Sequence, residues 1–466
     1  MEVAIVLVFI LGYLGITLEH SLKIDKLVPA LLMMAIAWIL VALGLDGFEN
    51  WFDSNNSALV DGFKSLPLHD VDELHELNEH SYAHSKMGWL EHTLLHHFGK
   101  TSEILFFLVG AMTIVEIIDH FDGFETIKNF VKTKKKKTLL WIVCILGFIL
   151  SAIIDNLTAT IVLITILRKL VPDAKLRMYY AGMIIIAANA GGAWSPIGDV
   201  TTTMLWMQKK VSAVGLMEYL IVPSIVCMAL PTLVATMLPV FKGEFETGEA
   251  DGHKANPKGP MMMYLGLFLI VLVPVIKTFT HLPPYVGMMF SLGFFSLVAE
   301  AVSARQFSLS NPNGMPDVHG GHANSPTFKA LSRIEMPSIL FFLGILMTVA
   351  ALESLGLIFN FGKSVSASIP ENLFVSLLGV GSAVVDNVPL VAASMGMFQH
   401  AEDHEIWHFI AYAAGTGGSM LIIGSAAGVV AMGMEKISFF WYLKNIAWLA
   451  LLGYLAGAGV FLAFFS

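Results

Sequence analysis

A seven-residue pattern occurs twice in this chain, each time inside an otherwise apolar segment. The copies are Ser-Ala-Ile-Ile-Asp-Asn-Leu at 151–157 and Ser-Ala-Val-Val-Asp-Asn-Val at 382–388. A carboxylate is expensive to bury in an apolar membrane segment, so such residues mark functional sites by default. One copy in each half of the chain predicts two structural repeats with a site where the repeats meet.

The apolar runs determine the class of protein. The 466 residues are 56% apolar and only 14% charged, with a mean hydropathy of +0.72, which excludes an ordinary soluble globule and a disordered chain. Runs near 20 residues fit membrane-spanning helices and are too long and uniform for barrel strands. We expect spans at 3–20, 27–45, 103–119, 178–207, 216–240, 261–279, 285–303, 337–356, 406–433 and 438–465.

The distribution of bases predicts a re-entrant hairpin in the first half. Lysine and arginine favour cytoplasmic loops, and basic stretches flank the region 138–170 on both sides. The bases are Lys128, Lys132, Lys134 to Lys137, Arg168, Lys169, Lys175 and Arg177. Both ends therefore face the cytoplasm, and at 1.5 Å per residue each arm is short for a core of ~30 Å. We expect a helical hairpin over 138–170 with its tip at Asp155 and Asn156.

A second hairpin is expected to enter from the opposite face. It covers 372–400, with Asp386 and Asn387 at its tip, and its far flank is acidic rather than basic. Opposite entry of two similar hairpins is what inverted repeats require. The predicted fold class is therefore an all-α polytopic membrane protein with inverted repeats, each containing a re-entrant helical hairpin and a broken transmembrane helix.

Glycine-rich segments after each hairpin predict the broken helices, at 178–207 and 406–433. Glycine and proline interrupt a helix, and irregular backbone at membrane depth is tolerated only where it lines a site or is buried in protein. Close helix packing is the alternative role for these glycines. The residues expected at the breaks are Gly191, Gly192, Pro196, Gly198, Gly417, Gly418 and Gly424.

The predicted organisation has four parts. Residues 1–102 hold two spans and a long, acidic, histidine-rich external loop; 103–240 form the first repeat; 241–336 hold linker spans and cytoplasmic loops; and 337–466 form the second repeat. The histidines of the loop either bind metal or sense pH, or they lie on a solvated amphipathic helix. They are His69, His75, His80, His84, His92, His96 and His97. A Gly-x-x-x-Gly pattern at 453–457 is a weak indication of a dimer contact.

The polar residues expected near the middle of the membrane have hard oxygen ligands and few neighbouring bases. They are Asp155, Asn156, Asp386, Asn387, Asp199, Asn189, Thr201, Thr202, Ser151, Thr158, Ser382, Thr416, Ser419 and Ser425. Sodium and lithium are hard cations, whereas the absence of sulfur and imidazole argues against a soft transition metal. A carboxylate that binds either Na⁺ or H⁺ makes the two ions compete, so Asp155, Asp386 and Asp199 are the predicted cation ligands.

Less specific interpretations stay open for several of these residues. The aspartates are also suited to capping helices, and Thr201 and Thr202 to bonding back to their own helix. Three further acids are candidates for a proton path, with interfacial solvation as the alternative. They are Glu116, Asp119 and Glu353.

Three motifs together resemble the NhaD-type sodium/proton antiporters of the ion transporter superfamily. They are the segments 151–160, 188–203 and 382–391. The resemblance implies export of Na⁺ or Li⁺ in exchange for protons, without a cofactor, by a homodimer in the inner membrane of a bacterium. It also implies that eight polar residues are important: Asp155, Asn156, Asn189, Asp199, Thr201, Thr202, Asp386 and Asn387.

Other functions fit the sequence less well. A dicarboxylate or other anion symporter on the same fold would meet repulsion from the two aspartates at the hairpin tips. An intramembrane aspartyl protease would use an aspartate pair, but its Tyr-Asp and Gly-x-Gly-Asp patterns are missing, and no enzyme is predicted. A channel would need a continuous pore. Nucleic acid is not an expected partner, because the sequence has no domain-long basic patch. The expected partners are cations, protons and the lipid bilayer.

Overall fold

The structure of the protein is a computed structural model that describes residues 1–17, 22–53, 58–69, 81–128, 133–245, 256–310, 325–384 and 386–465. The predictions for Lys132, His75 and His80 lie outside these residues. The described chain is almost entirely helical. Its two strands, β1 (Phe52–Asp53) and β2 (Ala58–Leu59), pair antiparallel.

Eight helices in the described residues are long and apolar enough to cross a membrane. They are α3 (Leu27–Gly44), α4 (Lys86–His120), α6 (Lys136–Ile154), α10 (Ala213–Ala235), α11 (Gly259–Thr280), α12 (Pro284–Ser310), α14 (Met336–Ser354) and α21 (Ala447–Phe465). This confirms the all-α polytopic membrane fold. The predicted span at 3–20 forms α1 (Glu2–Thr17), which has only 16 residues.

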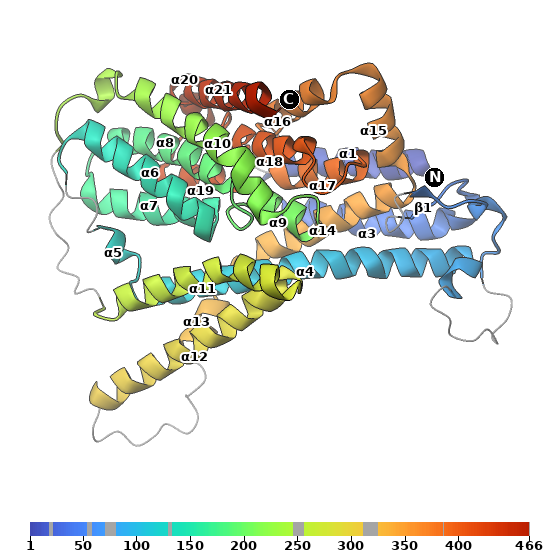
Figure 1. Ribbon diagram of the computed structural model, residues 1–466, viewed down its shortest axis with the longest axis horizontal. Helices are drawn as coiled ribbons and strands as arrows, with labels where there is room; N and C mark the ends of the chain where they lie inside the picture. The colour runs from blue at the N-terminus through green and yellow to red at the C-terminus, as the bar shows by residue number, and fades with distance from the viewer. Residues whose placement is uncertain are drawn as a thin grey trace. The chain divides into compact units, whose positions relative to one another are not determined.

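The shorter helices complete the fold (Figure 1). They are α5 (Glu125–Lys128), α7 (Asn156–Leu170), α8 (Ala174–Gly192), α9 (Val200–Met207), α13 (Pro326–Leu331), α15 (Leu357–Ser368), α16 (Glu371–Gly381), α17 (Asn387–Met397), α18 (Glu405–Gly417), α19 (Ala426–Glu435) and α20 (Phe439–Asn445). Single 3₁₀ turns lie at Leu45–Gly47, Phe63–Ser65, Ser81–His84 and Pro239–Phe241.

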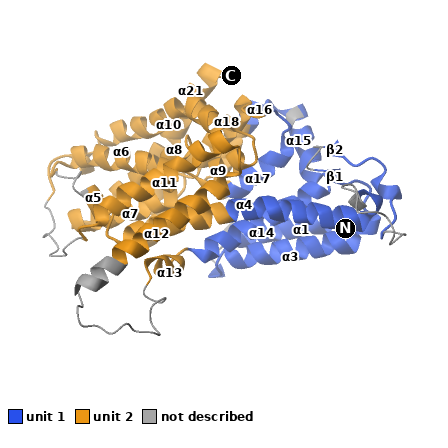
Figure 2. Ribbon diagram, turned by 60° about the horizontal axis from the view of Figure 1, so that its bottom comes forward, with its two compact units in different colours: residues 1–105, 335–374, 388–401 blue, residues 106–334, 375–387, 402–466 orange. Residues whose placement is uncertain are grey.

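Two compact units make up the structure (Figure 2). The first comprises residues 1–105, 335–374 and 388–401, and the second comprises 106–334, 375–387 and 402–466. In the first unit α1, α3 and α14 pack together around Ala30 and Phe341. Close packing of α3 on α14 needs Gly344, because a Cβ atom there would lie 2.8 Å from the backbone of Ala30. The predicted division of the sequence into four parts stays a prediction.

The helix α4 corrects the predicted external loop. It has 35 residues and begins at Lys86, so about half of this helix lies within the loop expected over 46–102, and His92, His96 and His97 lie on α4. The reason is that Trp89, Leu90 and other apolar residues continue the helical pattern of the span toward the N-terminus. Among the described residues, no three histidine, cysteine, aspartate or glutamate side chains are arranged so that they could hold a metal ion together.

The second unit is a bundle in which α6 packs along α8, and α10 packs along α21. The two glycines of the Gly-x-x-x-Gly pattern lie on α21 and allow it to pack closely against α10. A Cβ atom at Gly457 would lie 2.6 Å from the carbonyl oxygen of Pro223 in α10, and Gly453 faces the backbone of Cys227 in the same helix. The pattern therefore belongs to intramolecular packing, which removes its support for a dimer contact.

Candidate ion-binding site

Both predicted helix breaks are present in the second unit. The first separates α8 from α9 over residues 193–199, and the second separates α18 from α19 over residues 418–425. A Cβ atom at Gly192 would lie 2.5 Å from the oxygen of Gly198, and one at Gly418 would lie 2.6 Å from the oxygen of Gly424. Glycine is therefore required at the point where the backbone of each break folds back on itself.

The two hairpins contact the helices that precede the two breaks, α8 and α18, in the same way. The hydroxyl of Ser151 donates to the carbonyl of Ala188 at 2.5 Å, and that of Ser382 donates to the carbonyl of Ala414 at 2.8 Å. Each acceptor lies three residues before the glycine that contacts the hairpin backbone, which is Gly191 in one case and Gly417 in the other. The repeated sequence thus builds a repeated set of contacts, while the inverted orientation of the repeats stays a prediction.

The tip of the first hairpin places Asp155 between α6 and α7. Its carboxylate caps α7 by accepting hydrogen bonds from the backbone N–H of Thr158 at 2.8 Å and from its hydroxyl at 2.9 Å. The backbone of Asp155 has φ 73° and ψ 161°, a region occupied almost only by glycine. Such strain costs about 1–3 kcal/mol and clusters at functional sites.

Asp199 lies at the centre of the polar network and is only 2% exposed. The amide of Asn156 donates to its carboxylate at 2.7 Å, and the amide of Asn387 donates at 3.2 and 3.3 Å. The backbone N–H and the hydroxyl of Thr201 each donate at 2.8 Å, so Asp199 also caps α9. The tips of both hairpins and the first helix break therefore meet at one carboxylate.

Asn189 connects this carboxylate cluster to the second helix break. Its side chain is fully buried and donates to the hydroxyls of Ser419 and Ser425, each at 3.0 Å, while its oxygen accepts from Asn156 at 3.0 Å. Ser425 caps α19 and has φ −146° and ψ 153°, close to the −150° and 149° of Asp199. Asp199 and Ser425 therefore occupy matching positions at the ends of the two breaks.

The remaining predicted site residues lie near the network but bond elsewhere. The hydroxyl of Thr202 donates to the carbonyl of Asp199 at 2.9 Å, and that of Thr416 donates to the carbonyl of Tyr412 at 2.6 Å, so both bond back to their own segments. Thr158 holds Asp155, and Ser151 and Ser382 bond to neighbouring helices. Asp386 is half-buried directly before α17.

The role of the three acids suggested for a proton path stays a prediction. Glu116 is half-buried and Asp119 is exposed, both on α4. Glu353, at the end of α14, belongs to the first unit.

Sequence reasoning missed two residues that hold the breaks in place. The hydroxyl of Ser195 donates to the carbonyl of Ala152 at 2.6 Å, fixing the first break to the first hairpin. The hydroxyl of Tyr442 on α20 donates to the carbonyl of Ser419 at 2.7 Å. Ser195 lies inside the motif 188–203 and was accessible from the sequence, whereas nothing in the sequence links Tyr442 to a segment that precedes it by more than 20 residues.

The electrostatics of the site favour a bound proton or cation. Within the described residues, no lysine, arginine or histidine forms an ion pair with Asp155 or Asp199. Asp155 is half-buried and Asp199 is buried. The compensation that the structure describes for Asp199 consists of hydrogen bonds from the amide nitrogens of Asn156 and Asn387 and from the backbone N–H and hydroxyl of Thr201. Burial without an opposite charge disfavours an ionised carboxylate, so a proton or a cation would stabilise this site. The asparagine and threonine side chains also carry oxygens, which are hard ligands.

Broken helices that meet hairpin tips around a buried carboxylate define a secondary transporter of the membrane. The chain matches the citrate transporter family (CitMHS) over residues 6–408 and belongs to it. It is 40% identical over 472 residues to "Sodium/proton antiporter 1" of Arabidopsis thaliana, covering 99% of this chain and 72% of that protein. It is 29% identical over 481 residues to the "Na(+)/H(+) antiporter NhaD" of Alkalimonas amylolytica, covering 98% and 89%.

A solved structure shares the fold. The YdaH transporter of Alcanivorax borkumensis, described as having an unusual topology, superimposes with a TM-score of 0.54 at 14% identity, covering 93% of this chain and 97% of that one. The relatives named NhaD confirm the resemblance seen in the three motifs.

Proposed function

We propose that this protein is a secondary active antiporter that exports Na⁺, and also Li⁺, in exchange for protons. The observation that carries the proposal is the buried Asp199 carboxylate, which is bonded to two asparagine amides and a threonine without a basic partner among the described residues. The names of the relatives in Arabidopsis and Alkalimonas, both sodium/proton antiporters, support the choice of ions.

The proposed mechanism is competition between a cation and a proton for the intramembrane aspartates during alternating access. The cation or the proton binds at Asp199 and at Asp155 and Asp386, which lie at the hairpin tips. Asn156 and Asn387 donate to Asp199 through their amide nitrogens. Rotation of either amide about its last side-chain bond presents its oxygen instead, which supplies a further hard ligand to a cation. No cofactor is needed for this exchange.

The proposal places the protein as a multi-pass component of a lipid bilayer. We propose that the protein acts as a homodimer in the inner membrane of a bacterium. The relatives include a plant protein at 40% identity and bacterial proteins near 29%, so they support the membrane more than the kind of organism.

The alternative is symport of a carboxylate anion, which the description of the matched family favours because it names citrate. Three aspartates close to the hairpin tips and the first break oppose it, since each repels a carboxylate substrate when ionised. We therefore retain anion symport as one outcome of the test.

The test compares three aspartates that all cap helices. Asp155 caps α7, Asp199 caps α9 and Asp173 caps α8, but Asp173 is exposed and lies outside the network. Asparagine caps a helix about as well as aspartate, so Asp→Asn at each position removes the charge and keeps the cap. Proton flux is measured in proteoliposomes after addition of Na⁺, Li⁺, K⁺, succinate or citrate.

We expect Na⁺ and Li⁺ to dissipate a pH gradient in the wild type and in Asp173→Asn. Asp155→Asn and Asp199→Asn should lose the response, because the neutral side chain cannot carry the proton or balance the charge of the cation. Uptake of succinate or citrate without any cation-driven proton flux would overturn the antiporter and establish the symporter. Full activity of both network variants would show that the aspartates act only as caps.

A further inference from the structure

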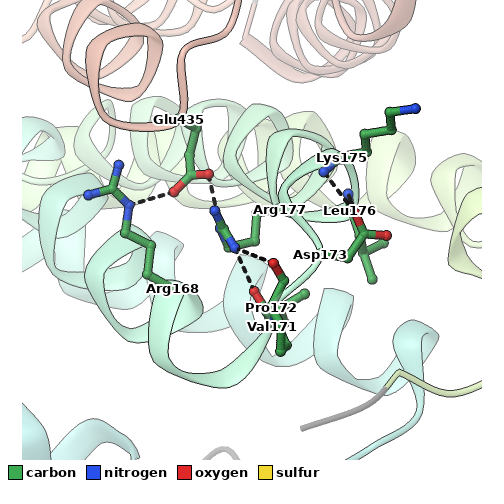
Figure 3. Close-up of polar contacts among 8 residues, drawn as sticks. All are labelled: Arg168, Val171, Pro172, Asp173, Lys175, Leu176, Arg177 and Glu435. Atoms are coloured by element: carbon green, nitrogen blue, oxygen red, sulfur yellow. Dashed lines mark hydrogen bonds and ion pairs between the residues drawn. The ribbon is translucent and has the colours of Figure 1, made fainter. Parts of the chain in front are cut away.

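Three charged side chains form a cluster at the end of α19, away from the residues assigned to ion binding (Figure 3). The carboxylate of Glu435, only 2% exposed, accepts hydrogen bonds from Nε of Arg168 at 2.7 Å and from Nε of Arg177 at 3.0 Å. Arg177 also donates through Nη1 to the carbonyls of Val171 and Pro172, both at 2.9 Å. The cluster lies entirely within the second unit.

Each of the three helices in the cluster carries a residue of the ion-binding network at its other end. Helix α7 begins at Asn156 and has Arg168 in its last turn. Helix α8 has Arg177 in its first turn and Asn189 near its end, while α19 follows Ser425 and ends at Glu435. The cluster therefore joins, at one end, the three helices whose opposite ends hold Asn156, Asn189 and Ser425.

Local stability does not account for a glutamate at this position. An acidic residue at the C-terminus of a helix interacts unfavourably with the helix dipole, and burial removes the carboxylate from water. Arg168 lies in the last turn of α7, where a positive charge interacts favourably with the helix dipole. Glu435 lies at the unfavourable end of α19 and is stabilised by its ion pairs with the two guanidinium groups. The Glu435 side chain is buried, whereas that of Arg168 is 45% exposed and that of Arg177 is 17% exposed. In some proteins a buried charge of this kind fixes how helices are arranged rather than adding net stability.

We propose that Glu435 is a positioning residue for ion binding. By holding the end of α19 against α7 and α8, it sets where Ser425 meets Asn189 and where Asn156 meets Asp199. This inference rests on the proposed function, since its main consequence is the affinity of that network for the transported cation. Arg168 and Arg177, whose charges also predict the topology, thereby have a second role.

The test uses the full-length protein in proteoliposomes and three variants. Glu435→Gln removes the charge that joins the helices, and Glu435→Asp retains it. The matched control is Glu125→Gln, because Glu125 pairs with Lys169, the neighbour of Arg168, but lies on the short helix α5, which carries no network residue. Two quantities are measured: KM and kcat for Na⁺-driven proton flux, and hydrogen–deuterium exchange of the α19 peptide.

We expect Glu435→Gln to raise the KM for Na⁺ about tenfold with a smaller change in kcat, which lies within the range by which residues without ligand contact change coupling to a site. Exchange of α19 should become faster, Glu435→Asp should recover most of the affinity, and Glu125→Gln should match the wild type. If Glu435→Gln does not yield folded protein, Arg168→Gln is used instead, because it leaves Glu435 paired with Arg177. This variant should show a smaller rise in KM and a smaller increase in the exchange of α19.

The two hypotheses fail in different ways. A wild type without cation-driven proton flux would overturn the proposed function, and deuterium exchange of α19 alone would then decide whether Glu435 holds the helices together. An active wild type with unchanged KM and unchanged α19 exchange in Glu435→Gln would overturn the positioning role. Equal effects of Glu435→Gln and Glu125→Gln would also overturn it, because they would show a general response to charge.

Discussion

Replacement of Gly417 by alanine should separate two helices that meet at their backbones. A Cβ atom at this position would lie 2.8 Å from the carbonyl carbon of Gly379 in α16 and closer still to its oxygen, whereas ordinary contact begins at 3.4 Å. The backbone of α16 has no rotamer through which to move away. The α16–α18 contact must therefore open by roughly 1 Å, which forfeits a quarter to a half of the dispersion attraction along it.

Overpacking of this kind costs about 1–3 kcal/mol and occasionally more, and contact with backbone places Gly417→Ala at the upper end, about 3 kcal/mol. The matched control lies two residues away in the same helix. A Cβ atom at Gly415 would be 3.4 Å from Cβ of Ala193, an ordinary contact. Gly415→Ala should therefore gain about 0.4–1 kcal/mol, because alanine restricts the unfolded chain more than glycine does.

Thermal unfolding in nanodiscs, followed by tryptophan fluorescence, measures the difference between the variants. Gly417→Ala should unfold several degrees below the wild type and lose cation-driven proton flux, while Gly415→Ala should unfold at or above the wild-type temperature. Equal unfolding temperatures for the two variants, with flux retained in both, would refute the conclusion that glycine is required for this backbone contact.

Two further predictions concern a helix cap and a surface charge. Ser425→Ala removes the cap of α19 and an acceptor of Asn189, so it should lower stability by about 1 kcal/mol and raise the KM for Na⁺ in flux assays; Ser438→Ala, which removes the cap of α20, should lower stability alone. A shift in KM in both variants would contradict this. The hydrogen bond from Lys64 holds the pKa of Glu49 below its usual range, so the stability that this pair adds is present at neutral pH and is lost as pH falls through the lowered pKa. Because both side chains are exposed, this stabilisation is small, and Glu49→Gln should not measurably lower the unfolding temperature at pH 7. A clear drop would contradict the expectation that an exposed ion pair contributes little.

The hairpin tips and helix breaks were predictable because glycine, proline, aspartate and asparagine are conspicuous in apolar surroundings. Asp155, Asp199 and the break after Gly192 follow from that contrast alone. The length of α4 was not predictable from hydropathy, since its first turns carry histidines and charges while apolar residues continue the helical pattern.

The choice among hydroxyls also lay beyond the sequence. Ser419 and Ser425 face Asn189, whereas Thr202 and Thr416 bond to their own segments, and the difference depends on how the backbone turns inside each break. The partners of Glu435 could not be predicted because Arg168 and Arg177 precede it by more than 250 residues. Such pairings arise from the packing of distant helices and leave no local pattern.

The matching backbone angles of Asp199 and Ser425 have a consequence for how proteins of this fold diversify. Both residues end a break and cap the helix that follows, so the same backbone accepts a charged or a neutral side chain at either place. The charge of the network can therefore change by a single substitution in one copy while the other copy preserves the shared geometry. The matching geometry offers a second position, Ser425, at which a carboxylate could be introduced without a change in the backbone of the helix break.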